Sequence, residues 1–207
     1  MRCASRPYGT SQALFEKLCD TSQKRDFSKF DKVILPECSK AYYDVEGFST
    51  YSDRIVYLNF PTLLRKNYIG EIVTDSMNIV YAGTTNSIYR NPKRAIDLLI
   101  KLQKYYPILV FHIYGDSDIG EELKYLEYKS NGAFVYHGVV EKEEAVWAMK
   151  NADYCVSFGN NVAGMVPSKV FELISTGKSI IHFTPGFNDS SMRYWQKYPK
   201  AQIVNYG

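Results

Sequence analysis

Short apolar runs and helical patterns alternate along the second half of the chain. Runs rich in β-branched and aromatic residues predict strands at 78–82, 108–114, 134–137, 154–158 and 179–183. Between them, apolar residues recur at spacings of three and four, which predicts helices that begin near residues 92, 121, 141 and 167. The first helix is expected to turn Ala95, Leu98, Leu99 and Leu102 toward the core. Alternating strands and helices form βαβ units, so we expect an α/β fold with a parallel sheet.

The clearest of these units spans residues 164–181. Pro167 suits the first turn of a helix, apolar residues follow at helical spacing, and Gly177 ends the helix before a buried strand. Lys169 and Glu172 lie three residues apart on its solvent side, beside backbone N–H groups that can bind a phosphate. A phosphate-bearing ligand and an ordinary surface ion pair explain this stretch equally well.

Each of the first four predicted strands ends at a glycine: Gly83, Gly115, Gly138 and Gly159. Ligands of open parallel sheets bind beyond the carboxyl ends of the strands, where these glycines fall. A tight turn explains any single one of them. Four together favour a binding edge.

The first 76 residues have a weaker pattern. A short helix is expected at 11–19 and short strands at 32–35 and 55–58, while residues 37–52 show no clear period. We therefore divide the chain into an N-terminal remnant or linker, 1–76, and a binding domain, 77–207. A truncation of this domain at its C-terminus stays open.

Composition and charge exclude several classes of function. The 207 residues include 25 basic and 22 acidic side chains, a net charge of +3, which argues against a nucleic-acid partner. Four widely spaced cysteines form no C-x-x-C pair, which argues against a zinc site and a disulfide framework. No apolar run approaches the roughly 20 residues of a membrane span, and the start lacks a signal-peptide core. We expect a cytoplasmic protein, free or peripheral at the inner face of the membrane.

Several short motifs follow one another in a recognisable order. They are Ile79 to Gly83 with Tyr89 to Pro92, Phe111 to Gly115, Val135 to Gly138, Asn151 to Tyr154, and Pro167 to Glu172 with Thr176 to Lys178. Together they resemble the C-terminal, donor-nucleotide-binding half of GT-B glycosyltransferases that build bacterial polysaccharides. The likeness covers roughly residues 30–187. It implies a Rossmann-like parallel sheet with helices on both faces.

The resemblance also implies roles for single residues. Glu172 would accept hydrogen bonds from the ribose hydroxyls of a nucleotide-sugar, and Lys169 and Arg90 would bind its diphosphate. Fixed cations and helix N-termini can stabilise a departing nucleoside diphosphate, so neither a metal nor another cofactor is expected. The full set of expected donor-binding residues is Gly83, Thr84, Arg90, Lys93, Gly115, His137, Gly138, Val139, Ser168, Lys169 and Glu172. For Arg90 and Lys93, a solvated helix start is an equally good explanation.

The chain departs from the family pattern in two ways. Many retaining members carry a Glu-x7-Glu motif, and Gly164 stands where its first Glu would precede Glu172. The stereochemistry of transfer is therefore not predicted. A GT-B enzyme also needs an N-terminal acceptor domain and a C-terminal crossing helix, for which this length leaves no room. We expect a fragment or half-enzyme that is inactive alone, and we assign no catalytic residue.

The expected function is transfer of a sugar from a UDP-sugar, GDP-sugar or similar donor to a glycan or lipid-linked acceptor. The acceptor would bind through a missing N-terminal domain or a partner chain. A second hypothesis is a non-catalytic nucleotide-sugar-binding module that acts with a separate acceptor-domain partner. A flavodoxin-like regulator is a weaker third, because acidic residues would then be expected where the first strand ends in Ala82-Gly83-Thr84.

Two further features have competing explanations. Asp116-Ser117-Asp118 has the Asp-x-Asp form that binds a divalent metal in GT-A glycosyltransferases. Because it follows a strand-end glycine, an acidic turn that caps the helix near residue 121 is the better explanation. His112, His137 and His182 lie in or at the ends of predicted strands, so we expect them to be packed and not catalytic.

Overall fold

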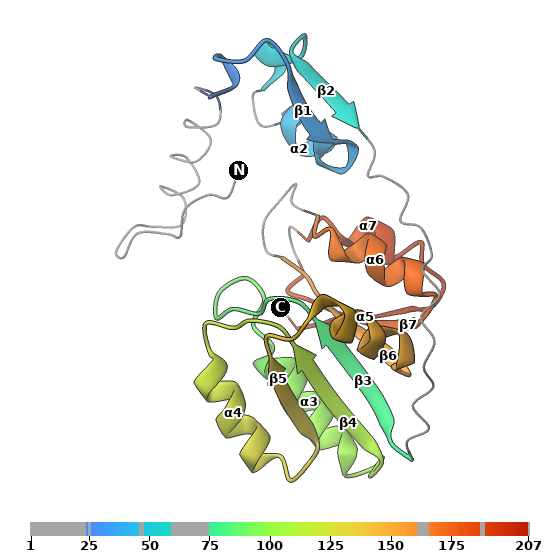
Figure 1. The fold of residues 1–207 in the computed structure, drawn as a ribbon. Coiled ribbons are helices and arrows are strands. Elements are labelled where there is room, and N and C mark those ends of the chain that lie inside the picture. The colour runs from blue at the N-terminus through green and yellow to red at the C-terminus, as the bar shows by residue number, and fades with distance from the viewer. Residues whose placement is uncertain are drawn as a thin grey trace. The chain divides into compact units, whose positions relative to one another are not determined.

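The computed structural model describes residues 24, 26–45, 48–58, 75–160, 166–186 and 189–206. The chain divides into two compact units, Met1–Pro61 and Thr62–Gly207, which are described separately below (Figure 1). The helix expected at 11–19 lies outside the described residues. In the described part of the chain, no helix combines the length and the apolar character of a membrane span.

The larger unit is built on a parallel sheet, as the sequence predicts, but the sheet has six strands and not the five that were expected. Its strands lie in the order β5-β4-β3-β6-β7-β8. Their bounds are β3 Met77–Ala82, β4 Leu109–Tyr114, β5 Phe134–Gly138, β6 Tyr154–Phe158, β7 Ser179–Thr184 and β8 Ala201–Asn205. All neighbouring strands pair in parallel. This confirms the expected α/β class.

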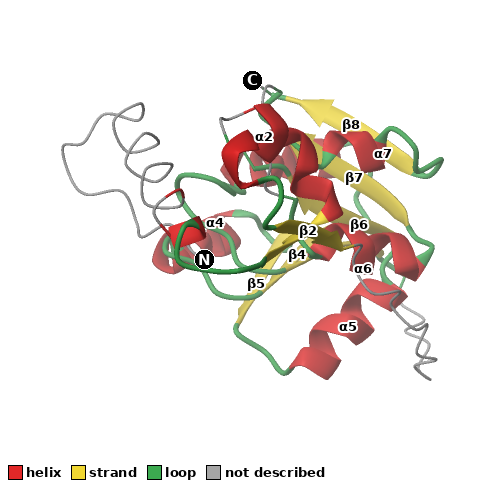
Figure 2. Ribbon diagram, turned by 90° about the horizontal axis from the view of Figure 1, so that it is seen from above, coloured by secondary structure: helices red, strands yellow, loops and turns green. Residues whose placement is uncertain are grey.

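Helices cover both faces of this sheet, as the family resemblance implies (Figures 1 and 2). One face carries α3 Lys93–Gln103 and α4 Gly120–Lys129, and the other carries α5 Lys142–Asn151, α6 Lys169–Thr176 and the short α7 Met192–Trp195. The buried apolar residues accordingly form two clusters, one on each side. Alternation within β3 shows why: Ile79 and Tyr81 belong to the first cluster, Val80 and Ala82 to the second.

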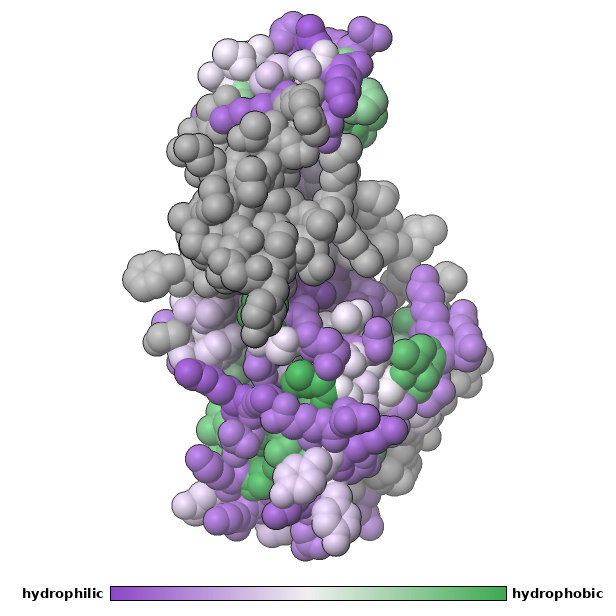
Figure 3. Space-filling model, turned by 90° about the vertical axis from the view of Figure 1, so that its left-hand side faces the viewer, coloured by the Kyte–Doolittle hydropathy of each residue, from purple (hydrophilic) through white to green (hydrophobic). Residues whose placement is uncertain are grey.

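The outward face of α4 is mainly polar. The side of the larger unit that carries α4 is mainly hydrophilic, with small hydrophobic patches between the charged side chains (Figure 3). Leu123 is the buried anchor of α4, whereas Tyr125 and Tyr128 point outward. This helix therefore contributes one narrow apolar stripe to the core.

The strand order creates a reversal point at the centre of the sheet. From β3 the chain proceeds outward through β4 to β5, and from β6 it proceeds the opposite way through β7 to β8. The loops that leave β3 and β6 therefore diverge at the carboxyl edge. Such a topological switch point is where open α/β sheets form a crevice for ligands.

Two details of the larger unit differ from expectation. Leu98 is 38% exposed, so its predicted inward position is wrong, whereas Ala95 and Leu99 are buried and Leu102 packs against the core, as expected. Ile96 is buried as well. The predicted series also ended at the strand 179–183, whereas the structure adds α7 and β8. A four-residue helix and a five-residue edge strand that includes Gln202 and Asn205 carry too little periodicity to be recognised.

The smaller unit contains a parallel pair of strands, β1 Val33–Pro36 and β2 Ile55–Leu58. Between them lie the 3-10 turns η1 Glu37–Ser39 and η2 Ser49–Tyr51 and the helix α2 Lys40–Val45. The aromatic rings of Phe27, Tyr43, Phe48 and Tyr51 pack together. The stretch without a period is therefore helical in part, in pieces too short to show a helical repeat.

Candidate functional site

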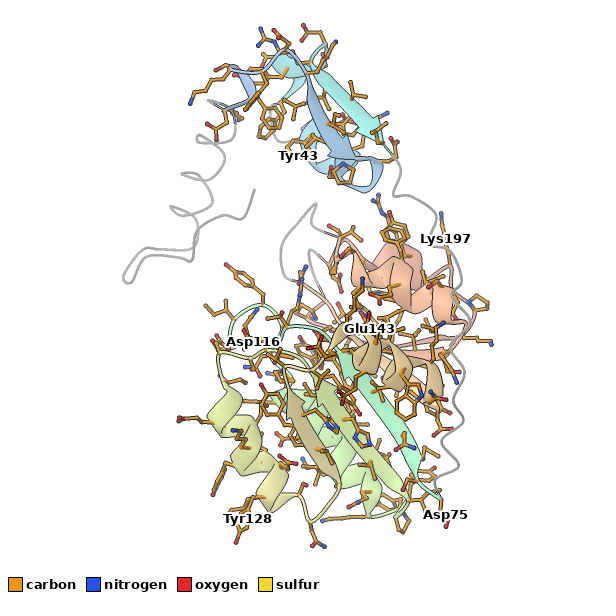
Figure 4. The ribbon with its side chains drawn as sticks, in the orientation of Figure 1. Tyr43, Asp75, Asp116, Tyr128, Glu143 and Lys197 are labelled. Atoms are coloured by element: carbon orange, nitrogen blue, oxygen red, sulfur yellow. The ribbon has the colours of Figure 1, made fainter. Side chains whose placement is uncertain are left out.

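The turns after β3, β4 and β5 are joined by their backbones. Gly83 donates its N–H to the carbonyl of Tyr114 at 2.8 Å, and Gly115 donates to the carbonyl of Gly138 at 2.7 Å. A β-carbon on Gly115 would lie 2.3 Å from the Gly83 carbonyl oxygen, and its φ of +136° also favours glycine. Three of the predicted glycines thus line adjoining turns at the carboxyl edge, where Figure 4 shows Asp116, far from Asp75 and Tyr128 at the opposite edge.

The loop between β3 and α3 is held in shape by Asn86. Its side-chain oxygen accepts the backbone N–H groups of Ile88, Tyr89 and Arg90 at 3.1, 2.6 and 3.1 Å. At the start of α3, Asn91 accepts the N–H of Lys93 at 3.0 Å. These bonds determine where the side chain of Arg90 leaves the loop.

The acidic motif after β4 supports the same loop. Asp118 accepts hydrogen bonds from both the N–H and the hydroxyl of Ser87, each at 2.8 Å. Since no side chain caps α4, the expectation that this turn caps the helix is wrong. Asp116 accepts the N–H of Ser117 at 2.9 Å. Among the described residues, no three His, Cys, Asp or Glu side chains gather around a common point as metal ligands would.

Arg90 crosses the reversal point of the sheet. Its Nε donates to the side-chain oxygen of Asn160, in the loop after β6, at 2.9 Å. The guanidinium also lies beside the hydroxyl of Tyr81, which itself donates to the carbonyl of Thr84 at 2.9 Å. Burial raises the pKa of Tyr81 to about 12, although the charge of Arg90 and its hydrogen bond act in the opposite direction. The phenol is therefore neutral, and Arg90 is more than a solvated helix start.

The other two expected cations are in ion pairs. Lys169 and Glu172 pair with each other on the first turn of α6, at 2.7 Å, and both are partly exposed. Lys93 pairs with Glu122 of α4, also at 2.7 Å. Within the described residues, no carboxylate pairs with Arg90. Ser168 precedes α6 and is exposed, and its side chain makes no capping hydrogen bond.

His137 lies in a row of stacked rings on the α5 side of the sheet. Its ring is parallel to that of Tyr114 at 3.9 Å, and its Nε2 lies 3.1 Å from Nδ1 of His112. His112 Nε2 in turn lies 3.1 Å from the side-chain oxygen of Asn78. Burial and the neighbouring imidazole lower the pKa of His112 to about 4, so it is neutral at pH 7. His137 is packed on one side only, and Val139 beyond it is 77% exposed.

The glycine after β6 has a packing role. A β-carbon on Gly159 would lie 2.0 Å from Oδ2 of Asp189, whose carboxylate also contacts His182 Nε2 at 2.8 Å. Ser191 donates its N–H and hydroxyl to the other oxygen of Asp189, at 3.0 and 2.6 Å. His182 is fully buried, which confirms that it is packed.

Three residues that shape the site were not singled out in the sequence: Tyr81, Asn86 and Asn160. Asn160 follows a strand-end glycine, a position where a polar residue could have been noticed. Its hydrogen bond with Arg90 joins residues 70 positions apart in the sequence, so no local sequence pattern predicts it.

No family model matches the sequence, and no curated protein matches it significantly. Several solved structures, in contrast, match the fold of this chain. A mutant of S. aureus TarM, in complex with Fondaparinux, alpha-GlcNAc-glycerol and UDP, gives a TM-score of 0.58 at 11% identity over 84% of this chain and 34% of that one. The pneumococcal O-GlcNAc transferase GtfA, in complex with UDP and GlcNAc, gives 0.58 at 17% identity over 78% of this chain and 32% of that one. The lipopolysaccharide outer core galactosyltransferase WaaB gives 0.52 at 17% identity over 83% of this chain and 55% of that one.

These neighbours are GT-B glycosyltransferases, and the fold of this chain is that of a Rossmann-like GT-B half. The sequence resemblance is thereby confirmed at the level of the fold. The chain spans about a third of the length of TarM and GtfA and 55% of WaaB. At such low identities the chemistry has to be argued from the residues of the site.

Proposed function

We propose that the larger unit binds the nucleoside diphosphate of an activated sugar and acts as the donor-binding half of a glycosyltransferase. One observation carries this proposal. Of the three cations expected at the site, Arg90 alone is held by neutral groups among the described residues, and it lies at the reversal point of the sheet.

A fixed guanidinium at this place suits a diphosphate. Arg presents planar N–H donors that match phosphate oxygens, and its charge persists at every physiological pH. The helix α6 begins at Lys169 and is the element that follows β6 along the chain. Backbone N–H groups at a helix start favour anions, so this helix and Arg90 can stabilise the same leaving group without a metal or other cofactor.

The ion pair on α6 gives two residues a role each. Glu172 is partly exposed and is proposed to accept hydrogen bonds from the ribose hydroxyls. When Glu172 binds the ribose, its ion pair with Lys169 weakens. The ammonium group of Lys169 can then bind a phosphate oxygen. Because both side chains are only partly buried, exchanging this pair for a ligand costs little.

The adjoining glycine turns complete the proposed site. Gly83 and Thr84 would bring backbone close to a phosphate, with Gly115 supporting them, and the turn at His137, Gly138 and Val139 would contact the base. Ser168 would add a hydroxyl at the start of α6. Lys93 would contribute long-range charge only, since Glu122 already pairs with it.

Transfer needs an acceptor site that we propose lies in an N-terminal domain or a partner chain, which would also supply the catalytic base. The acceptor would be a growing glycan or a lipid-linked sugar of a polysaccharide pathway, in the cytoplasm or at the inner face of the membrane. The length of the similar structures supports this view, and one of them is a GtfA/B complex. The same observation leaves a second candidate, a non-catalytic donor-binding module. An acceptor domain encoded in the same or an adjacent reading frame would favour the enzyme.

Calorimetric titration tests the proposal directly. UDP, GDP and ADP are titrated without magnesium into wild type, Arg90→Gln and Arg94→Gln. Arg94 is the matched control, because it lies four residues further along the chain, in α3, and contacts the ring and carbonyl of Tyr206. We expect one nucleotide to bind wild type and Arg94→Gln alike, and Arg90→Gln at least about tenfold more weakly, which is about 1.4 kcal/mol. Absence of binding to wild type, or equal binding to Arg90→Gln, would refute it.

A further inference from the structure

The two groups that hold Arg90 are both uncharged, and one of them is incompletely bonded. Asn160 is 2% exposed, and its side-chain oxygen accepts from Arg90. Its amide nitrogen, Nδ2, is buried and has no hydrogen-bond partner among the described residues. An unsatisfied buried donor is destabilising, so this position is not optimised for stability alone.

An aspartate at this position should stabilise the protein more than the asparagine does. It has the same size and shape as asparagine, lacks the orphaned donor, and could accept two N–H groups of the guanidinium. It would also neutralise the charge of Arg90. The asparagine therefore keeps the orientation of the guanidinium and leaves its charge unpaired.

The backbone around Asn160 is well anchored for such a role. Gly159 donates its N–H to the carbonyl of Phe183 at 2.8 Å, and the buried Asp189 packs directly against its α-carbon. Arg90 also lies beside the hydroxyl of Tyr81, which is 5% exposed and donates to the Thr84 carbonyl. Arg90 is thus held by two buried neutral side chains, one from β3 and one from the loop after β6.

We propose that Asn160 is a positioning residue that orients Arg90 without neutralising it, so that the guanidinium presents its full charge to an oxygen of the donor diphosphate. This inference rests on the proposed function. It adds that Asn160 lowers the stability of the fold and thereby keeps the charge of Arg90 available for the anion. The buried amide acts through Arg90 and needs no contact with the ligand.

The test is Asn160→Asp, examined for stability and for binding at pH 8, where the new carboxylate is ionised. We expect the melting temperature to rise by about 2–4 °C, because a charged hydrogen bond replaces the orphaned donor. The affinity for the nucleoside diphosphate should fall about tenfold or more, and that for the matching nucleoside should not change. A residue of merely structural importance would move stability and affinity in the same direction. Asn131→Asp, in the exposed turn after α4, controls for one added negative charge and should change neither.

Asn160→Ala provides a second arm in case the aspartate variant fails to fold. It releases Arg90 and should weaken diphosphate binding while nucleoside binding persists. The inference is overturned if either variant binds the diphosphate as wild type does, or if the nucleoside is lost in parallel. Its failure differs from that of the proposed function, since wild type would then still bind the nucleotide and Arg90→Gln would still bind it weakly.

Discussion

The carbonyl oxygen of Gly83 lies 2.3 Å from the place where a β-carbon on Gly115 would begin. Two consecutive turns of the sheet edge therefore touch through their main chains. Only a residue without a side chain permits this contact, because the obstacle is backbone and cannot rotate away. The geometry of the whole edge depends on it.

Gly115→Ala should accordingly destabilise the protein by about 3 kcal/mol, through the clash and the unfavourable φ. Urea denaturation measures the loss. Gly120→Ala is the matched control, since its β-carbon would meet Tyr136 only at ordinary van der Waals distance and the residue begins a helix. That variant should be neutral or slightly stabilising. Equal effects of the two would show that the Gly83 contact is unimportant.

Glu172→Gln should change two binding equilibria in opposite directions. Removal of the carboxylate frees Lys169 from its 2.7 Å ion pair, so pyrophosphate should bind severalfold more tightly. The nucleoside alone should bind more weakly, because a ribose partner is lost. Calorimetry with the two separate ligands distinguishes these effects. Stability should change by no more than about 0.5 kcal/mol, since the pair is partly exposed.

His112 should make stability depend on pH below neutrality. The unfolded chain protonates this residue near pH 6.5, whereas burial and His137 lower the pKa to about 4 in the folded protein. Its contribution is therefore complete above pH 6.5 and declines as the pH falls toward 4. After allowance for partial exposure, the loss is on the order of 1–2 kcal/mol.

Urea titrations between pH 7.5 and 4.5 test this, with His112→Gln expected to flatten the curve. An NMR titration follows the ring itself. A measured pKa of His112 near its ordinary value would contradict the prediction.

Asp189 should act on the acid side of the stability curve. Burial alone would raise its pKa, but hydrogen bonds from His182 and Ser191 outweigh this and hold the pKa below its usual range. Its contribution is therefore present above the unfolded pKa and is lost as the pH falls through the folded pKa. Asp189→Ala, which leaves His182 buried without its partner, should cost about 3–5 kcal/mol at pH 7.

The acid limb of the curve provides the check on Asp189. In Asp189→Asn, part of the loss of stability below pH 4 should disappear, because the titrating group is absent. An unchanged acid limb would mean that the carboxyl titrates normally in the folded protein.

Local periodicity was sufficient to predict the parallel sheet and most of its elements. Strands buried on both faces have nearly continuous apolar runs, as in Tyr154–Phe158, where Ser157 is the exception. Gly177 ends its helix as predicted, and the structure shows it in the left-handed conformation. The edge strand Ala201–Asn205 escaped notice because only part of it is buried. Leu98 was misassigned because adjacent apolar positions on a helix leave its exact inward face ambiguous.

The contacts of the site were less accessible than the fold. Arg90 could be named from the family resemblance, but its partner Asn160 becomes a neighbour only through the strand order. Lys93 looked equivalent to Arg90 until the packing of α3 beside α4 gave it Glu122. Asp118 resembled a metal ligand or a helix cap, and only the folded loop shows that it binds Ser87. Pair partners across a sheet leave no trace in a local pattern.

The bonds from Gly83 to Tyr114 and from Gly115 to Gly138 join the three neighbouring turns through their backbones. Thr84 and Val139 directly follow the two outer turns of this set, so the backbone bonds constrain the spacing between them without any ligand. In the proposed donor site, a nucleotide that contacts both turns would have to fit this spacing. Nucleoside monophosphates and triphosphates, whose phosphate chains differ in length from that of a diphosphate, should therefore bind more weakly even where their bases are accepted.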